Sequence, residues 1–360
     1  MTQPASTQPS LPISVLDLVG LNPNESAGSA IARSVELARA VESFGYTRFW
    51  LAEHHSIAGL ACSATAVLIG HVAQATTTIR VGSGGIMLPN HAPLVVAEQF
   101  GTLASIYPNR IDLGLGRAPG GDYATMHALR RDLGQSGDNF PELLQELRMY
   151  LAPNQPGRRV HAYPGEGTEV PITLLGSSTY SATLAAQQGL PFAFAAHFAP
   201  QALYSASEIY LDNFQPSPAS SYQKLTQPHL TLAIPVIVAE TDAEARRLLT
   251  TPQQRFLRLI RNLPVESLPP IDPEAMDELW NPIEREAVEA RLAAAIVGSE
   301  STVRAGLDHL LRTTGAHEII AVTDIFTPEA RIDSYRRLAQ IAKTLHPHAA
   351  SVGQGFSPAI

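Results

Sequence analysis

The order of elements along the 360 residues predicts an α/β fold, a (β/α)8 TIM barrel with insertions. Eight β-like runs alternate with helix-like segments, which indicates parallel βαβ units. The turn after the first run, residues 18–26, lacks the glycine fingerprint typical of an open dinucleotide-binding sheet. The 28 prolines concentrate in a few tracts, which suggests one barrel with excursions instead of two domains.

The first half of the chain contains four β-like runs. The run 13–17 precedes a helix-like segment, 27–44, in which apolar residues recur every three or four positions. Gly45 follows this segment, as at many helix C-termini. The next β-like runs are 47–53, 79–87 and 110–116. Helices are expected over 63–75, 93–105 and 141–151.

The second half begins with an excursion rich in proline and glycine, 152–171, which suggests a small hairpin. The alternation then resumes with β-like runs 172–177, 192–196, 230–239 and 318–323. Helices are expected over 180–188, 201–214, from 242 onward, 301–314 and 329–345. A second irregular tract, 262–281, contains four prolines. We expect a single barrel domain over 13–345, with flexible termini at 1–12 and 346–360.

The composition is that of a globular protein, with 45% hydrophobic residues and a formal net charge of −8. This acidic balance disfavours binding to nucleic acid or anionic membranes, which requires clustered Lys and Arg. The single cysteine, Cys62, allows neither an intramolecular disulfide nor a cysteine-based zinc site. Residues 1–12 lack a signal-peptide pattern, and no 18 apolar residues run together. We therefore expect a cytoplasmic protein.

Residues that suit an anion follow two neighbouring β-like runs. Ser177, Ser178 and Thr179 open a helix, where hydroxyls and free N–H groups favour an anion, although Ser and Thr are also common N-caps. Arg117 ends the preceding run, and a guanidinium beside hydroxyls is typical of a phosphate clamp. The alternative for Arg117 is a surface salt bridge. The C-terminal ends of barrel strands form the active site, so we expect a phosphate here.

Glu53, His54 and His55 end the second β-like run. An imidazole at this position can act as a general acid or base near neutral pH. Side chains alternate along a strand, so the two histidines cannot both face the site if the strand continues. A metal site is the runner-up, but metal-binding barrels commonly present His-x-His. A satisfied structural pair is the remaining alternative.

The third β-like run contains Gly82, Gly84 and Gly85. Glycine inside a strand often marks a bulge or the close approach of a ligand to the backbone, such as a flat ring. A bend at a barrel corner is the alternative. The glycines of this run and the next do not form GxGxxG, so we expect no nicotinamide site.

Four segments in this order resemble the bacterial luciferase-like, flavin-dependent monooxygenases: 49–55, 81–89, 110–119 and 175–181 running on to 189–192. The resemblance extends over residues 13–345. It implies a barrel that is usually a homodimer and uses FMN or, in some branches, F420. It also implies O2 and a small-molecule substrate as reactants. Reduced flavin would come from a separate reductase, since the chain has no nicotinamide fingerprint.

The resemblance also implies roles for particular residues. His54 matches the catalytic histidine of the family. Gly84 and Gly85 match a non-proline cis peptide against which the flavin ring lies. The residues that match the family's phosphate contacts are Arg117, Ser177, Ser178 and Thr179, with Tyr180 as a further candidate. No metal is implied.

The chain departs from luciferase itself at two positions. Luciferase has a second phosphate arginine, but residues 138–141 contain none, and Arg130 or Arg131 are the candidate replacements. Gly116 stands where luciferase has a cysteine. We expect an FMN-dependent monooxygenase acting on a small, apolar, aldehyde-like substrate, with the tract 262–281 as a lid. The alternatives are an F420-dependent oxidoreductase, a non-catalytic flavin-binding protein, or a metal-dependent or phosphate-binding barrel without flavin.

Overall fold

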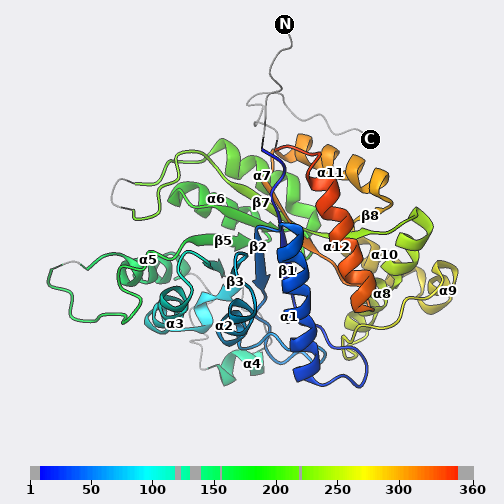
Figure 1. Ribbon diagram of the computed structural model, residues 1–360, viewed down its shortest axis with the longest axis horizontal. Helices are drawn as coiled ribbons and strands as arrows, with labels where there is room; N and C mark the ends of the chain where they lie inside the picture. Colours follow the sequence, from blue (N-terminus) through cyan, green and yellow to red (C-terminus); the bar gives the residue numbers. More distant parts are fainter. Residues whose placement is uncertain (1–8, 118–122, 130–138, 155, 219–220, 348–360) are drawn as a thin grey trace, which may run out of the picture.

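Eight parallel strands close into a barrel in the computed structural model, which describes residues 9–117, 123–129, 139–154, 156–218 and 221–347 (Figure 1). The ring closes because β1 pairs with both β2 and β9. The strands, in order around the ring, are β1 (Ile13–Asp17), β2 (Arg48–Leu51), β3 (Arg80–Met87), β4 (Ile111–Gly116), β5 (Ile172–Gly176), β6 (Phe192–Ala195), β7 (Leu230–Val238) and β9 (Glu318–Val322). The predicted (β/α)8 barrel is therefore confirmed.

Helices cover the outside of the ring, and α1 lies beside α12 in Figure 1. In α1, the Ser26 side chain accepts a hydrogen bond from the N–H of Ser29, and Gly45 ends the helix at φ 88°. The helices that follow barrel strands are α1 (Ala27–Phe44), α2 (Thr65–Ala75), α3 (Pro93–Ile106), α5 (Phe140–Leu151), α6 (Thr179–Gln188), α7 (Leu203–Asp212), α8 (Asp242–Ile260) and α12 (Pro328–Ala342).

Some elements differ from the sequence-based expectation. The predicted hairpin in 152–171 is wrong, because the described part of this excursion forms turns and contains no strand. The tract 262–281 is not irregular throughout, since it includes α9 (Pro273–Leu279). The sequence analysis also did not anticipate α4 (Tyr123–Ala128), α10 (Pro282–Arg291) and β8 (Ile296–Gly298). The expected helix near 301–314 is present as α11 (Glu300–Thr314).

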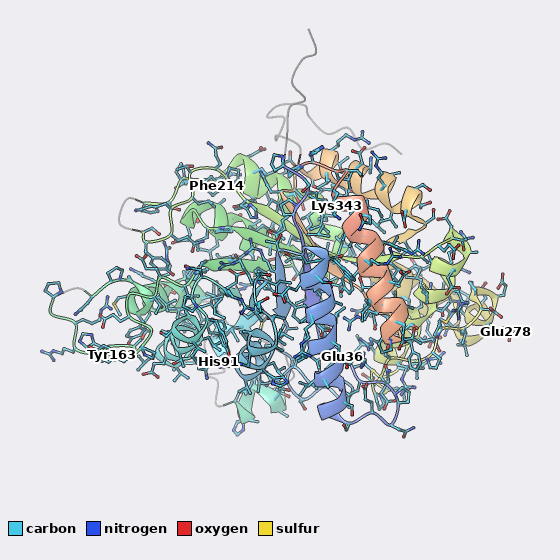
Figure 2. The ribbon with its side chains drawn as sticks, in the orientation of Figure 1. Glu36, His91, Tyr163, Phe214, Glu278 and Lys343 are labelled. Carbon is cyan, nitrogen blue, oxygen red and sulfur yellow. The ribbon has the colours of Figure 1, made fainter. Side chains whose placement is uncertain are left out.

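The two excursions lie on opposite sides of the barrel. Tyr163, in the first excursion, and Glu278, in the second, lie toward opposite edges of Figure 2. The strand β8 pairs with residues 236–238 of β7, beyond the residues of β7 that pair with β9. The second excursion and its helices therefore extend the barrel on the side of β7. The expected flexible ends fall largely on residues 1–8 and 348–360, which lie outside the described residues.

The core follows from the burial of parallel strands on both faces. All residues of β1 and β4 are buried. Phe49, Phe192 and Phe194 are among the largest fully buried side chains. In the described residues, no helix has both the length and the apolar character needed to cross a membrane.

A network of buried charges joins the N-terminal ends of four strands. Glu318, at the start of β9, accepts hydrogen bonds from Ser14 Oγ and from Arg48 Nε at 2.9 Å. Arg48 and Arg80 both contact the carboxylate of Asp112 in β4. Burial would raise the pKa of Glu318, but Arg48 and the hydrogen bonds lower it to about 2. This network lies at the end of the barrel opposite the active-site end, where side chains contribute to stability.

We expect Glu318→Gln to lower the free energy of unfolding by about 3 kcal/mol, because it leaves part of a buried charge network uncompensated. Denaturant unfolding followed by circular dichroism measures this loss. Glu278→Gln, at an exposed position in α9, should change the free energy by less than about 0.5 kcal/mol. Equal effects of the two substitutions would contradict a stabilising role for the network.

Candidate functional site

Arg117 and Tyr180 lie together at the C-terminal ends of β4 and β5. These strands are neighbours, and Gly116 pairs with Leu175. The guanidinium of Arg117 lies over the Tyr180 ring, with Cζ 4.3 Å from the ring centroid. A cation stacked on an aromatic face keeps its N–H donors free at the ring's edge. The two side chains thus form a positively charged corner at the mouth of the barrel.

The N-terminus of α6 opens beside this corner. Thr179 is the first helical residue, and the side chain of the N-cap Ser178 makes no capping hydrogen bond. A Cβ at Gly176 would lie 2.2 Å from Cβ of Ser181, so only glycine allows the strand to end directly against the helix. Ser177 and Ser178 are partly exposed, and Thr179 is exposed. The structure therefore brings hydroxyls, helical N–H groups and Arg117 to one place.

The glycines of β3 lie at a bulge. The register between β3 and β4 shifts between Ser83 and Ile86, and the peptide bond between Gly84 and Gly85 is cis. A Cβ at Gly85 would lie 2.7 Å from the carbonyl oxygen of Gly114, and one at Gly84 would meet Cδ1 of Leu16 at the same distance. The bulge that the sequence suggested is therefore present. The backbone that closely approaches Gly85 is that of the neighbouring strand β4.

His54 and His55 face different surroundings. The strand β2 ends at Leu51, and the two side chains diverge in the loop that follows. His54 is partly buried and lines the cavity described below. Burial lowers the pKa of His54, with a further lowering from His55, and the charge of Glu53 opposes this only in part. Burial thus favours the neutral form of the His54 imidazole.

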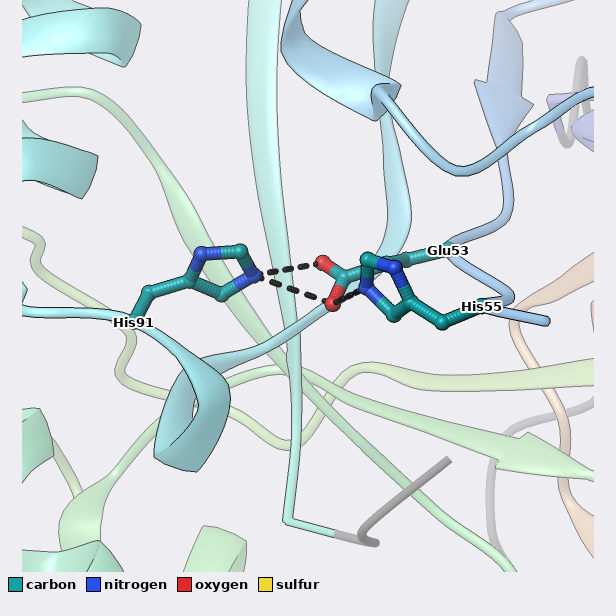
Figure 3. A group of neighbouring side chains, drawn as sticks. All are labelled: Glu53, His55 and His91. Atoms are coloured by element: carbon teal, nitrogen blue, oxygen red, sulfur yellow. Dashed lines mark hydrogen bonds and ion pairs between the residues drawn. The ribbon is translucent and has the colours of Figure 1, made fainter. Parts of the chain in front are cut away.

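Glu53 holds two histidines at the ends of β2 and β3 (Figure 3). Its buried carboxylate is bonded to Nε2 of His55 and to Nε2 of His91, each at 2.9 Å. It also accepts a hydrogen bond from the backbone N–H of Met87 at 3.2 Å. Burial would raise the pKa of Glu53, but the bonds from His91, His55 and Met87 lower it. An ionised carboxylate thus ties the two strand ends together.

These three residues also have the composition of a metal site. Their potential ligand atoms all lie within 4.8 Å of one another. Among the described residues, this is the one group of three or more His, Cys, Asp or Glu side chains that lie so close together. Each Nε2 atom, however, is already hydrogen-bonded to Glu53. The sequence analysis did not single out His91, because it follows β3 and reaches Glu53 only in the folded chain.

A cavity of about 220 Å³ opens beside His54. Its lining comes from the ends of β1, β7 and β9, from the loops after β2 and β6, and from α8. In the order of strands around the ring, β9 and β1 lie opposite β4 and β5. The cavity and the Arg117 corner therefore occupy opposite sides of the barrel mouth, and His54 belongs to the cavity side.

The cavity walls are mainly apolar, with a few titratable groups. His197, which follows β6, lines the cavity with His54, and burial lowers its pKa to about 4. The charged lining residues are Asp17, Arg33, Arg255, Asp324 and Arg331. His197 and Asp324 could be connected with the site from the sequence only because each directly follows a predicted strand. Arg255 carried no such signal because it lies within α8.

The second excursion closes one wall of this cavity. The backbone N–H of Val265 donates to the carbonyl of Ala58, and that of Ser267 donates to the carbonyl of Leu21. Thr251, in α8, donates from its hydroxyl to the carbonyl of Leu268. The first part of the tract thus lies across the loops after β1 and β2. That it acts as a moving lid stays a prediction. Arg130 and Arg131, the candidates for a second phosphate arginine, lie outside the described residues.

Cys62 is fully buried beside this site. Burial raises the pKa of its thiol to about 12, so the thiolate does not form near neutral pH. Cys62 is therefore a small buried residue and not a nucleophile.

We expect the native protein to resist labelling by Ellman's reagent at pH 8, because the thiol is both protonated and inaccessible. After unfolding in guanidinium chloride, one equivalent per chain should react, since the sequence has one cysteine. Absorbance at 412 nm measures both states. Rapid labelling of the native protein would show that Cys62 is reactive instead of buried.

Comparison with known proteins places this geometry in context. The sequence model for luciferase-like monooxygenases matches residues 11–318. A luciferase-like monooxygenase of Escherichia coli (strain K12) is 46% identical over 339 residues, which cover 94% of this chain and 99% of that protein. The crystal structure of apo-MsnO8 has a TM-score of 0.83 at 36% identity, covering 94% of this chain and 100% of that one.

More distant structures share the fold. One is the oxygenating constituent of 3,6-diketocamphane monooxygenase from Pseudomonas putida in complex with FMN, with a TM-score of 0.70 at 19% identity, covering 94% of this chain and 99% of that one. Another is an F420-dependent secondary alcohol dehydrogenase, with a TM-score of 0.67 at 14% identity, covering 92% of this chain and 99% of that one. The structural neighbours of the chain thus include one enzyme in complex with FMN and one that depends on F420.

Proposed function

Because the chain belongs to the luciferase-like monooxygenase family, we propose that it is an FMN-dependent monooxygenase that acts with O2 on a small, largely apolar substrate, for example an aldehyde. The observation that carries this proposal is the division of the barrel mouth. A cationic corner built around Arg117 lies on one side, and an apolar cavity lined by His54 lies on the other.

The cationic corner has the chemistry needed to hold the FMN phosphate. Arg117 would supply a charge-assisted hydrogen bond, and the hydroxyls of Ser177, Ser178 and Thr179 would supply further donors. The uncapped N-terminus of α6 adds backbone N–H groups and a favourable dipole. Tyr180 would orient the guanidinium by its stacking contact.

The flavin ring would lie between the corner and the cavity, against the bulge of β3. Gly84 and Gly85 carry no side chain there, so a flat ring could approach their backbone. When bound in its reduced form, FMN would supply the electrons that activate O2. The protein's part is to position the ring and the substrate and to limit the access of water.

His54 would be the catalytic residue. Burial lowers the pKa of its imidazole and favours the neutral form, which can accept a proton from a substrate in the cavity and return it later. The cavity volume, about 220 Å³, is below the range of about 300–1,000 Å³ that is typical for drug-sized ligands. This supports a small substrate, and the apolar walls support one with a largely apolar body.

The proposal includes two partners. A separate reductase would supply reduced flavin, because the chain has no nicotinamide fingerprint. The protein would act as a homodimer, as the resemblance implies. The alternative cofactor is F420, which neighbouring structures of this fold also use. A cofactor titration distinguishes the two.

We expect the purified protein to bind FMN or reduced FMN more tightly than F420, as measured by fluorescence and absorbance titration. Arg117→Ala should weaken FMN binding about tenfold or more, because a charge-assisted contact contributes about 1.5–3 kcal/mol. Arg312→Ala, on the outer surface of α11, is the control and should leave the affinity unchanged. Tighter binding of F420, or equal FMN affinity in both variants, would overturn the FMN proposal or the role of Arg117.

We expect His54→Ala to reduce substrate-dependent product formation by about 100-fold or more, the usual contribution of a general acid or base. Its FMN affinity should stay within about threefold of the wild-type value, because His54 lies on the cavity side of the mouth. Oxygen uptake and product analysis with reduced FMN and a panel of aldehydes measure the reaction. His71→Ala, at an exposed position in α2, is the matched control.

The same assay tests the non-catalytic alternative. A flavin-binding protein without turnover would convert all consumed O2 to peroxide with every aldehyde. If His54→Ala formed product at the wild-type rate, the proposed monooxygenase activity would stand, but His54 would be excluded as its catalytic residue.

A further inference from the structure

Arg255 is an incompletely paired cation in the wall of the apolar cavity. The residue lies in α8, and its side chain is only 14% exposed. Its Nη1 atom forms an ion pair with Oδ2 of Asp324 at 3.1 Å. The Nε atom is buried and has no hydrogen-bond partner among the described residues. A buried donor without an acceptor costs about 1–3 kcal/mol, so the fold keeps this guanidinium in the cavity wall at a cost in stability.

The other two arginines of the cavity have hydrogen-bond acceptors on both Nε and Nη2. Arg33 donates to Glu25 and to the carbonyl of Gly20. Arg331 donates to Asp17 at 2.9 Å and to the carbonyl of Thr323 at 2.7 Å. Burial of these two guanidinium groups is thus compensated by several acceptors each. Among the described arginines that line the cavity, Arg255 is the one with a buried nitrogen that has no hydrogen-bond partner.

The position of the Arg255 guanidinium is built into the fold. The group lies directly over Gly20, in the loop after β1, where an added Cβ would stand 2.7 Å from Nη2. Any larger residue would displace the guanidinium, unless the Arg255 side chain moved. Asp324 holds its other side, and Asp324 in turn lies 3.4 Å from the hydroxyl of Ser267. Arg255 is therefore held in place and does not sample solvent freely.

The side chains around Arg255 indicate what kind of ligand the cavity could hold. Apolar side chains from α8 and from the second excursion line the same cavity, among them Leu249, Phe256, Leu259 and Val265. His54 and His197 line it from the barrel mouth. A ligand that fills this space would place an anionic end at Arg255 and an apolar body against these walls. Its reacting end could then extend toward His54.

We propose that Arg255 binds the carboxylate of the substrate, so that the substrate class is a small carboxylic acid with an apolar body. The planar fork of a guanidinium matches a carboxylate, which can accept hydrogen bonds from two N–H groups at once. The negative charge of Asp324 beside Arg255 disfavours a dianion such as a phosphate ester. Asp324 would also compete with the ligand and thus moderate its affinity. This assignment of the substrate class rests on the proposed function of the same site.

The test uses hexanoate and its uncharged analogue hexanamide, titrated against the flavin-free protein by ligand-observed NMR. Wild-type protein should bind hexanoate about tenfold more tightly than hexanamide. Arg255→Gln should lose this preference, with hexanoate binding weakened about tenfold or more and hexanamide binding nearly unchanged. Arg246→Gln, an exposed position on the same helix, should keep the wild-type preference. Equal affinities of wild-type protein for the two probes would overturn the proposal.

Asp324→Asn provides a second variant in case Arg255→Gln does not fold, which thermal unfolding would reveal. Removing the competing carboxylate should tighten hexanoate binding about threefold or more. If Arg255 and Asp324 formed only a structural ion pair, this variant would bind hexanoate no better than wild type, and that result would also overturn the proposal.

The outcome is separable from that of the proposed function. Preference for hexanoate in a protein that fails to bind FMN would support the carboxylate site and reject the flavin proposal. FMN binding without a preference for hexanoate would reject the carboxylate site and leave the flavin proposal intact.

Discussion

The arrangement of the site depends on the close approach of two strand backbones, β3 and β4. A Cβ at Gly114 would stand 2.1 Å from the carbonyl oxygen of Ser83, so no other residue fits there without moving a strand. Gly85 meets the carbonyl of Gly114 in the same way. This contact coincides with the bulge in β3, which leaves a stretch of backbone without side chains at the barrel mouth.

The electrostatics of the barrel differ between its two ends. At the N-terminal ends of the strands, Arg48, Asp112 and Glu318 satisfy one another within a buried network. At the C-terminal ends, Arg117 stacks on an aromatic ring, and the buried Nε of Arg255 has no hydrogen-bond partner among the described residues. Losing one partner of a closed network destabilises a fold, whereas incompletely paired groups retain the capacity to bind. The difference supports the assignment of the C-terminal end as the functional one.

The loops after β2 and β3 connect these parts. Glu53 joins His55 and His91 and accepts a hydrogen bond from Met87, directly beyond the bulge. His54 is the neighbour of this anchored group in the chain, so its backbone position is set by contacts that its side chain does not use. The second excursion then covers the cavity beside His54 through Val265 and Ser267. Positioning of the imidazole and shielding of the cavity thus come from different segments.

The sequence by itself determined the barrel and the residues at its strand ends, because alternation of short apolar runs and amphipathic segments is a local property that the fold preserves. It also marked His54, Arg117 and the segment 177–180, since strand ends meet at one face of a barrel. Only the tertiary structure decided that Glu53 pairs with His91 and that Arg255 enters the cavity. It also produced α9 from a proline-rich tract and added β8 beside β7. The physical reason is that a side chain's partner, its burial and its unused donors exist only once distant segments pack together.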